Sequence, residues 1–144
     1  MNIISIVIIG FIVLEVTNVI ALYFFPGSKY ANSIGFFKAW DKSKQEPELH
    51  DLVRYLVNWV AGTKLIFLLL LTVILFTADA QGFFYTALAL IISISSFFWR
   101  LFPLIRKMDR EDQIDPKNYS AILGLMISLL VMVFVAALLI TGWQ

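Results

Sequence analysis

Long runs of apolar residues alternate with short polar stretches along this chain. A helix needs about 20 mostly apolar residues to cross roughly 30 Å of hydrocarbon at about 1.5 Å per residue. Four segments have that length and character: 3–25, 58–77, 83–105 and 119–141. Runs such as 65–76 are too long and too continuous for the alternating strands of a membrane barrel. The pattern therefore predicts an all-α fold, a polytopic bundle of four transmembrane helices.

The connector between the first two spans has a helical pattern of its own. Pro26 and Gly27 end the first helix, and Ser28 can cap a new one. Lysines lie among and beyond a face of aromatic and apolar side chains, which is typical of a helix in the headgroup layer. We therefore predict a short amphipathic interfacial helix over about 28–44, with Trp40 as an anchor at the membrane interface. Its apolar face consists of Tyr30, Ile34, Phe37 and Trp40.

The composition agrees with a membrane protein. Of the 144 residues, 60% are hydrophobic and 15% are charged, and the mean hydropathy is +0.87. A soluble domain has about 45–50% apolar and about 25% charged residues. We interpret residues 1–144 as a single integral membrane domain. The first span has no basic stretch before it and no small-x-small cleavage pattern after it, so we expect it to be retained rather than removed as a signal peptide.

Several kinds of chemistry are excluded by residue content. The chain has no cysteine, which rules out thiolate nucleophiles, iron–sulfur clusters and the usual structural zinc sites. Its one histidine, His50, lacks a second nitrogen or sulfur ligand, and we predict no metal site and no role for this residue. The net charge of +1 argues against nucleic acid as a partner.

Basic residues gather in two of the connecting loops. Because loops rich in lysine and arginine stay in the cytoplasm, both long loops are predicted to be cytoplasmic and both termini extracytoplasmic. We expect an integral protein of a plasma or inner membrane. The basic residues are Lys29, Lys38, Lys42, Lys44 and Arg54 around the first loop, and Arg106, Lys107, Arg110 and Lys117 in the second.

Glu15 is the most informative residue, because it lies inside the first predicted span. It is ten positions from Phe25, or roughly 15 Å, which is close to the middle of a bilayer. A charge there costs roughly 2.5–3.5 kcal/mol, so the carboxylate is expected to face the bundle interior and take a partner. Asn18 lies on the same helical face one turn nearer the cytoplasm. Lys64 in the second span has two alternatives, pairing with Glu15 or extending to the interface.

Three further polar residues lie toward the cytoplasmic ends of the second and third spans. Residues 48–54 are expected to continue the second helix, which places Arg54 and Asn58 one turn apart on it. Arg100 lies about 8 Å from the inner end of the third. We hypothesise an inward-facing site that holds an anionic or zwitterionic ligand or couples protons at Glu15; a purely structural polar network is the alternative. The candidate ligand- or ion-binding residues are Glu15, Asn18, Arg54, Asn58, Lys64 and Arg100.

At Arg54-Tyr55-Leu56-Val57-Asn58 the chain resembles the membrane-associated proteins in eicosanoid and glutathione metabolism, the MAPEG superfamily. Members share the predicted plan of four helices with both termini outside, and an Arg-x-x-x-Asn pair opens their second helix. Glu46-Pro47-Glu48 is similar to an acidic-Pro-acidic segment that precedes the second helix in some members. Arg100 lies roughly where the family has an arginine near the inner end of its third helix. The resemblance implies a trimer with glutathione or a lipid at subunit interfaces, and Arg100 as the cation that stabilises a thiolate.

The sequence also departs from that family pattern. Ala61 and Lys64 stand where the pattern has a glutamate and a proline, and Pro103 stands where it has an aromatic residue or a histidine. The family does not account for Glu15.

Three functions follow as hypotheses. The first is a transporter or channel subunit for a small ion or an anionic or zwitterionic solute, which needs a homo-oligomer because four helices are few for a pathway. The second is a MAPEG-like membrane enzyme or binding protein that takes glutathione or a lipid. The third is an assembly or regulatory subunit whose polar residues bind a partner's helices. The sequence leaves open whether the protein is an enzyme and names no cofactor beyond the glutathione of the second hypothesis.

Overall fold

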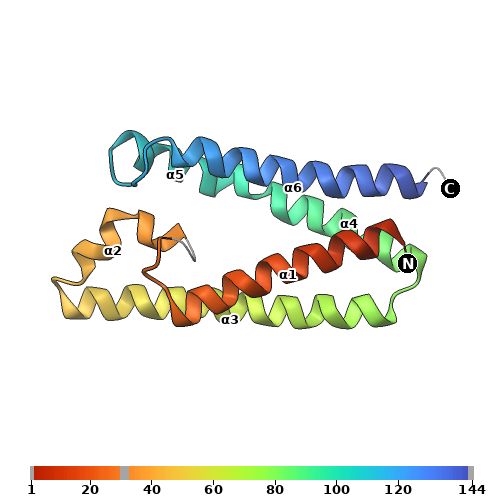
Figure 1. Cartoon of the computed structure of the whole chain (residues 1–144), viewed down its shortest axis with the longest axis horizontal. Coiled ribbons are helices and arrows are strands. Elements are labelled where there is room, and N and C mark those ends of the chain that lie inside the picture. The colour runs from red at the N-terminus through yellow and green to blue at the C-terminus, as the bar shows by residue number, and fades with distance from the viewer. Residues whose placement is uncertain (1, 30–32, 143–144) are drawn as a thin grey trace.

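The computed structural model describes residues 2–29 and 33–142, and this part of the chain consists of helices joined by short connectors, without strands (Figure 1). Four stretches are long and apolar enough to cross a membrane, which confirms the all-α class and the four long apolar helices that the sequence predicts. These stretches are Ile3–Phe24, Pro47–Thr77, Ala80–Arg110 and Tyr119–Thr141. The elements in chain order are α1 (Ile3–Phe24), the 3₁₀ turn η1 (Ser33–Phe36), α2 (Lys38–Ser43), α3 (Pro47–Thr77), α4 (Ala80–Ser95), α5 (Phe97–Arg110) and α6 (Tyr119–Gly142).

Polar side chains accept hydrogen bonds from backbone N–H groups at the starts of α1, α4 and α6. The side chain of Asn2 accepts a hydrogen bond from the amide of Ile4 at 3.2 Å, and Asp79 accepts one from Gly82 at 2.8 Å. Asp109 caps α6 from a distance, because its carboxylate accepts bonds from the Asn118 and Ser120 amides at 3.0 and 2.9 Å. These caps stabilise helix ends whose first N–H groups have no partner within the helix.

The third predicted span is divided at Ser96, which separates α4 from α5. The Ser96 hydroxyl donates a hydrogen bond to the Ser93 carbonyl at 2.6 Å, and the Trp99 amide bonds to Ser96 in a tighter turn. Pro103 lies inside α5 and has no N–H to give to the preceding turn. Side-chain bonds to the backbone and a missing N–H are both known causes of helix bends.

The single helix predicted over 28–44 is not confirmed. Within the described residues this connector contains η1, an extended Phe37 and the short α2, while the predicted face residue Tyr30 lies outside the described part. The backbone of this connector bonds instead to the α5–α6 connector: Lys38 donates to Gln113 and Asp115 donates to Phe36, both at 2.9 Å. Pairing between the two connectors thus replaces the helical bonds that the sequence pattern suggested.

Trp40 was expected at the membrane interface but is buried within the protein, with 6% of its surface exposed. It packs in a cluster with Leu22, Val57 and Ala61, where α1, α2 and α3 meet. A Cβ added to Gly27 would overlap the Trp40 indole, so the glycine makes room for the ring. The indole therefore fixes the connector to the α1–α3 pair.

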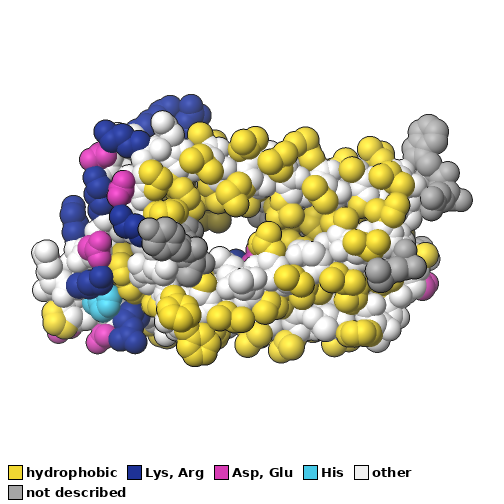
Figure 2. All heavy atoms as spheres, viewed as in Figure 1, with side chains coloured by type: hydrophobic (Ala, Val, Ile, Leu, Met, Phe, Trp, Pro, Cys, Tyr) yellow, Lys and Arg dark blue, Asp and Glu magenta, His cyan; other side chains and the backbone are white. Residues whose placement is uncertain are grey.

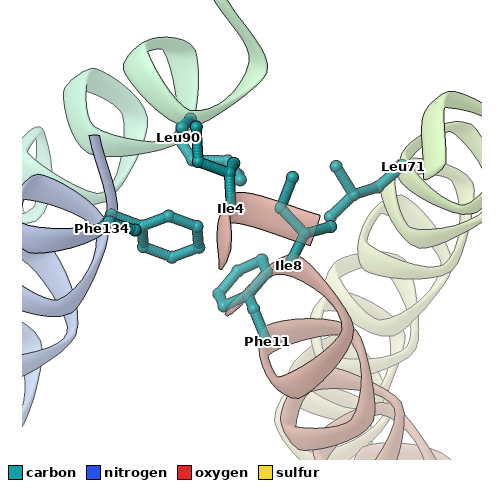
Figure 3. Close-up of a cluster of buried hydrophobic side chains, with 8 residues drawn as sticks. Ile4, Ile8, Phe11, Leu71, Leu90 and Phe134 are labelled. Carbon is teal, nitrogen blue, oxygen red and sulfur yellow. The ribbon is translucent and has the colours of Figure 1, made fainter. Parts of the chain in front are cut away.

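The main hydrophobic core lies near the end of the bundle that holds both termini. Ile4, Ile8 and Phe11 of α1 point toward Leu71 of α3, Leu90 of α4 and Phe134 of α6 (Figure 3). From there α1 slopes away from α6 and runs beside α3 (Figure 1). In the described residues α3 and α6 both pack on α1 but not on each other. α1 therefore separates from α6 between the terminal end of the bundle and the paired connectors.

Ion pairs between the connectors are expected to strengthen their pairing in a pH-dependent way. Lys38 donates to Asp112 at 2.7 Å and thereby lowers the pKa of that carboxyl below 3.8, with a further contribution from Lys117. The carboxylate's contribution is thus present above pH 3.8 and is lost as the pH falls through the lower pKa of the folded protein. Asp112→Asn should speed hydrogen exchange at the Lys38 amide by a small factor, because the pair is exposed.

Exchange is measured by mass spectrometry at neutral pH and again well below pH 3.8. The difference in exchange rate between Asp112→Asn and wild type is expected at neutral pH and should vanish in acid. Asp51→Asn, which removes an exposed carboxylate elsewhere, is the matched control. A difference that persisted unchanged in acid would contradict the assignment to this ion pair.

Candidate functional site

The centre of the candidate site is an ion pair between α1 and α3. Lys64 Nζ donates to Glu15 Oε2 at 2.6 Å and to Asn18 Oδ1 at 3.0 Å. Of the two alternatives for Lys64, the structure therefore has the pairing with Glu15. The Glu15 side chain is 18% exposed and the Lys64 side chain 35%, so the pair is largely but not completely enclosed.

Local sequence explains why these side chains meet. Glu15 and Asn18 are three residues apart and project from one face of α1. On α3, Ala61 is fully buried one turn from Lys64, and a Cβ on Gly62 would lie 3.3 Å from Tyr23 Oη. Small residues of this kind allow two helices to approach closely. The close contact of α1 and α3 then brings the ammonium within reach of both oxygens.

Two grooves flank the ion pair, and Glu15 and Lys64 line both. The first has a volume of about 780 Å³ and lies between α1, α3 and α6, where Figure 2 shows the molecule hollowed. The second, of about 640 Å³, lies between α1, α3 and α4. Apart from Asn18, Thr63 and Ser93 the walls are apolar. The ion pair is therefore a polar spot between two apolar grooves.

Both partners keep unused hydrogen-bonding capacity. An ammonium has three donors, of which Glu15 and Asn18 take two. Glu15 Oε1 has no hydrogen-bond partner among the described residues, yet no buried side-chain polar atom there is without one. The second carboxylate oxygen is therefore accessible. A bound group could accept from Lys64 and donate to Glu15 at the same place.

The other predicted site residues do not join this cluster. Arg54 and Asn58 are exposed on α3 toward the connector end, and Arg100 is exposed on α5 with its guanidinium 5.7 Å from the Trp99 ring centre. Within the described chain none of the three has a side-chain hydrogen bond or an ion pair, and none lines either groove. Arg100 is remote because α5 packs on α4 and α6, while the ion pair lies between α1 and α3.

The α6 wall of the first groove was missed by sequence reasoning. Leu123, Ile127 and Leu130 line it, at the spacing of one helical face. The sequence does not distinguish this face from the others, because α6 is apolar on all sides and has no amphipathic pattern. Polar residues of a site could be found from the sequence, but the apolar surface opposite them could not.

His50 and the acidic residues serve structural contacts. His50 Nδ1 lies 2.8 Å from Ser43 Oγ, and its ring packs edge-on against Trp40 with the centres 5.0 Å apart. Ser43 donates its proton to the Trp40 carbonyl at 2.7 Å, so the histidine nitrogen is the donor in their contact. In the described residues no group of three histidine, aspartate or glutamate side chains is placed to hold a metal ion.

No known protein family, curated protein or solved structure matches this chain. The resemblance to the MAPEG superfamily therefore rests on Arg54, Asn58, Arg100 and the Glu46-Pro47-Glu48 segment alone.

The first groove makes a prediction about water access. The chain has no cysteine, so a single introduced thiol reports on one position. Ile127→Cys places the thiol in the groove, and Met132→Cys places it on an exposed part of α6 outside it. In proteoliposomes a water-soluble maleimide should label position 127 and not position 132, because a lipid-facing thiol stays protonated and out of reach. Absence of labelling at position 127 would show that water does not reach the groove, and equal labelling of both positions would show that access is not specific to the groove.

Proposed function

We propose that this chain is an integral membrane protein and a subunit of a small homo-oligomeric transporter or channel. Its solute is a small ion or an anionic or zwitterionic molecule. The observation that carries the proposal is the Glu15–Lys64 ion pair, which lies at mid-length of its helices and borders two grooves. Ionisable groups inside a membrane are expensive and are found mainly on transport and proton pathways.

Depth supports this role. Glu15 lies nine residues from the end of α1 at Phe24, or about 14 Å along the helix, which puts it near the middle of a bilayer about 30 Å thick. Lys64 lies in the central part of α3. Substrate and coupling-ion sites of secondary transporters also lie near the midplane.

The chemistry of the pair fits a zwitterion. A solute ammonium can bind Glu15 while a solute carboxylate binds Lys64, and Asn18 can accept or donate beside them. The protein pair then exchanges its mutual contact for two contacts with the solute. Such an exchange keeps every charge compensated in a medium of low dielectric constant, where an unpaired charge is most costly.

Orientation follows from the positive-inside rule. Lysine and arginine side chains gather at the connector end, and both chain ends lie at the opposite end (Figures 1 and 2). We therefore assign the connector end to the cytoplasm and the termini to the outside of a plasma or inner membrane. The first groove extends toward the connector end, where it is lined by Leu22, Ile34 and Val53. In this orientation the groove opens toward the cytoplasm.

Oligomerisation supplies what one chain lacks. Four helices enclose no pathway here, and both grooves are open at the side. A second copy packed over a groove would close it against lipid and leave an opening at its ends.

The MAPEG-like alternative draws on a different observation. Arg54 and Asn58 are exposed and have no side-chain partner in the described chain. They are therefore free to contribute to a site shared with a neighbouring copy, as the resemblance implies for glutathione or a lipid. Stabilisation of the protein by glutathione that Arg100→Ala removes would favour this enzyme or binding function over transport.

Transport is tested in proteoliposomes with Glu15→Gln. Two probes are used. Proton flux is monitored with a pH-sensitive dye trapped in the vesicles, and zwitterion flux is measured with radiolabelled amino acids. We expect a wild-type flux that depends on pH and falls about tenfold or more in the variant, because a contact to a charged group contributes about 1.5–3 kcal/mol. Glu48→Gln, which removes an exposed carboxylate at the start of α3, should leave the flux unchanged. Equal flux of wild type and Glu15→Gln for every probe would refute the proposal.

A further inference from the structure

The carboxylates around the α5–α6 connector are all engaged by partners other than arginine. Asp112 pairs with Lys38 at 2.7 Å and with Lys117 at 3.9 Å, and Asp115 pairs with Lys29 at 3.0 Å. Glu111 lies 3.8 Å from Lys107 and accepts from the Gln113 side chain at 2.6 Å. Asp41 forms an ion pair with Lys44, and Asp109 accepts hydrogen bonds at the start of α6. None of these carboxylates pairs with an arginine, and the remaining carboxylates at this end, Glu46, Glu48 and Asp51, have no ion-pair partner in the described chain and belong to the start of α3.

The arginines of the described chain have no ion-pair partners. Six of the seven lysines form ion pairs there, whereas none of the four arginines does. Three of these arginines, Arg100, Arg106 and Arg110, belong to α5. Arginine is the residue best shaped for phosphate, because its planar guanidinium donates two parallel hydrogen bonds to two oxygens.

Two of them share a concave site. Arg106 and Arg110 are one turn apart on α5 and line a cavity of about 490 Å³ together with Lys107. Phe102 and Pro103 form its apolar wall. Glu111 also lines the cavity and pairs with Lys107 at 3.8 Å, which leaves the two arginines as its uncompensated charges. The cavity therefore combines three cations with an aromatic and an aliphatic surface.

The surface of α5 next to this cavity is apolar and uncovered. Trp99, Pro103, Arg106 and Arg110 follow at spacings of four, three and four residues and so share one face of the helix. On this face Trp99 is 76% exposed and Pro103 is also exposed. None of the α5 residues is buried, although the helix packs on α4 and α6. The cations thus stand at the end of an apolar strip that lies within the same candidate span.

We propose that the Arg106–Lys107–Arg110 pocket binds the phosphate of an anionic phospholipid, whose acyl chains lie along the exposed apolar strip of α5. The position at the end of a span is the depth at which lipid phosphates are found, and basic clusters there bind anionic headgroups. A soluble phosphate would use the cations but leave the apolar strip bare. The inference rests on the proposed membrane placement, not on transport, since the pocket is separate from the Glu15–Lys64 grooves.

The experiment compares two lipids on the full chain in detergent. Phosphatidylglycerol or phosphatidylcholine with the same acyl chains is titrated in, and bound lipid is counted by native mass spectrometry. We expect wild type to retain the anionic lipid preferentially. The double variant Arg106→Gln/Arg110→Gln should lose that preference by about fivefold per arginine, the ratio that corresponds to roughly 1 kcal/mol for each basic residue. Each single variant gives a second reading should the double variant fail to fold.

The matched control is Lys29→Gln/Lys117→Gln, which removes the same charge from the same end but leaves the pocket intact. It should keep most of the preference. Equal retention of both lipids by wild type, or an equal loss in the control, would overturn the proposal. Glycerol phosphate, the headgroup without chains, should not compete with the lipid; effective competition would reassign the pocket to a soluble phosphate. Loss of lipid preference with intact flux, or the reverse, separates this proposal from the transport proposal.

Discussion

The Glu15–Lys64 ion pair is the constraint on which the arrangement of the other helices depends. In the proposed membrane placement, a carboxylate and an ammonium at mid-length of two apolar helices must stay together, because either one alone is costly in hydrocarbon. That requirement holds α1 against α3 beside Ala61 and Gly62, where small side chains allow close contact. Because α1 runs alongside α3, it diverges from α6. The first groove is the space between these helices.

The two ends of the bundle are stabilised by different interactions. Near the termini an aliphatic and aromatic core joins α1, α3, α4 and α6, with Phe11 and Phe134 in edge-to-face contact at 5.8 Å. At the other end backbone hydrogen bonds and ion pairs join the two connectors, and Trp40 ties them to the α1–α3 pair. The ion pair lies between these ends. The Glu15–Lys64 pair is therefore held in place by the hydrophobic core on one side and by the paired connectors on the other, while the two grooves beside it stay open.

The sequence predicts the spans well, because their length and uninterrupted apolar character follow from the thickness of a bilayer. It also identifies Glu15, Asn18 and Lys64, because polar groups stand out in apolar helices. It could not show that Arg100 lies apart, since this depends on α5 packing on α6. Nor could it show the break at Ser96, which is set by a side-chain bond to the backbone, or the burial of Trp40, since an aromatic face suits a protein core as well as an interface.

A double-mutant cycle on Glu15 and Lys64 tests the central claim most directly. The free energy of unfolding is measured in detergent for wild type, Glu15→Gln, Lys64→Met and the double variant. The ion pair predicts that each single variant is destabilised and that the double variant loses less than the sum, with a coupling of about 1 kcal/mol or more. Strictly additive losses would contradict the account, because they would mean that the two side chains do not depend on each other.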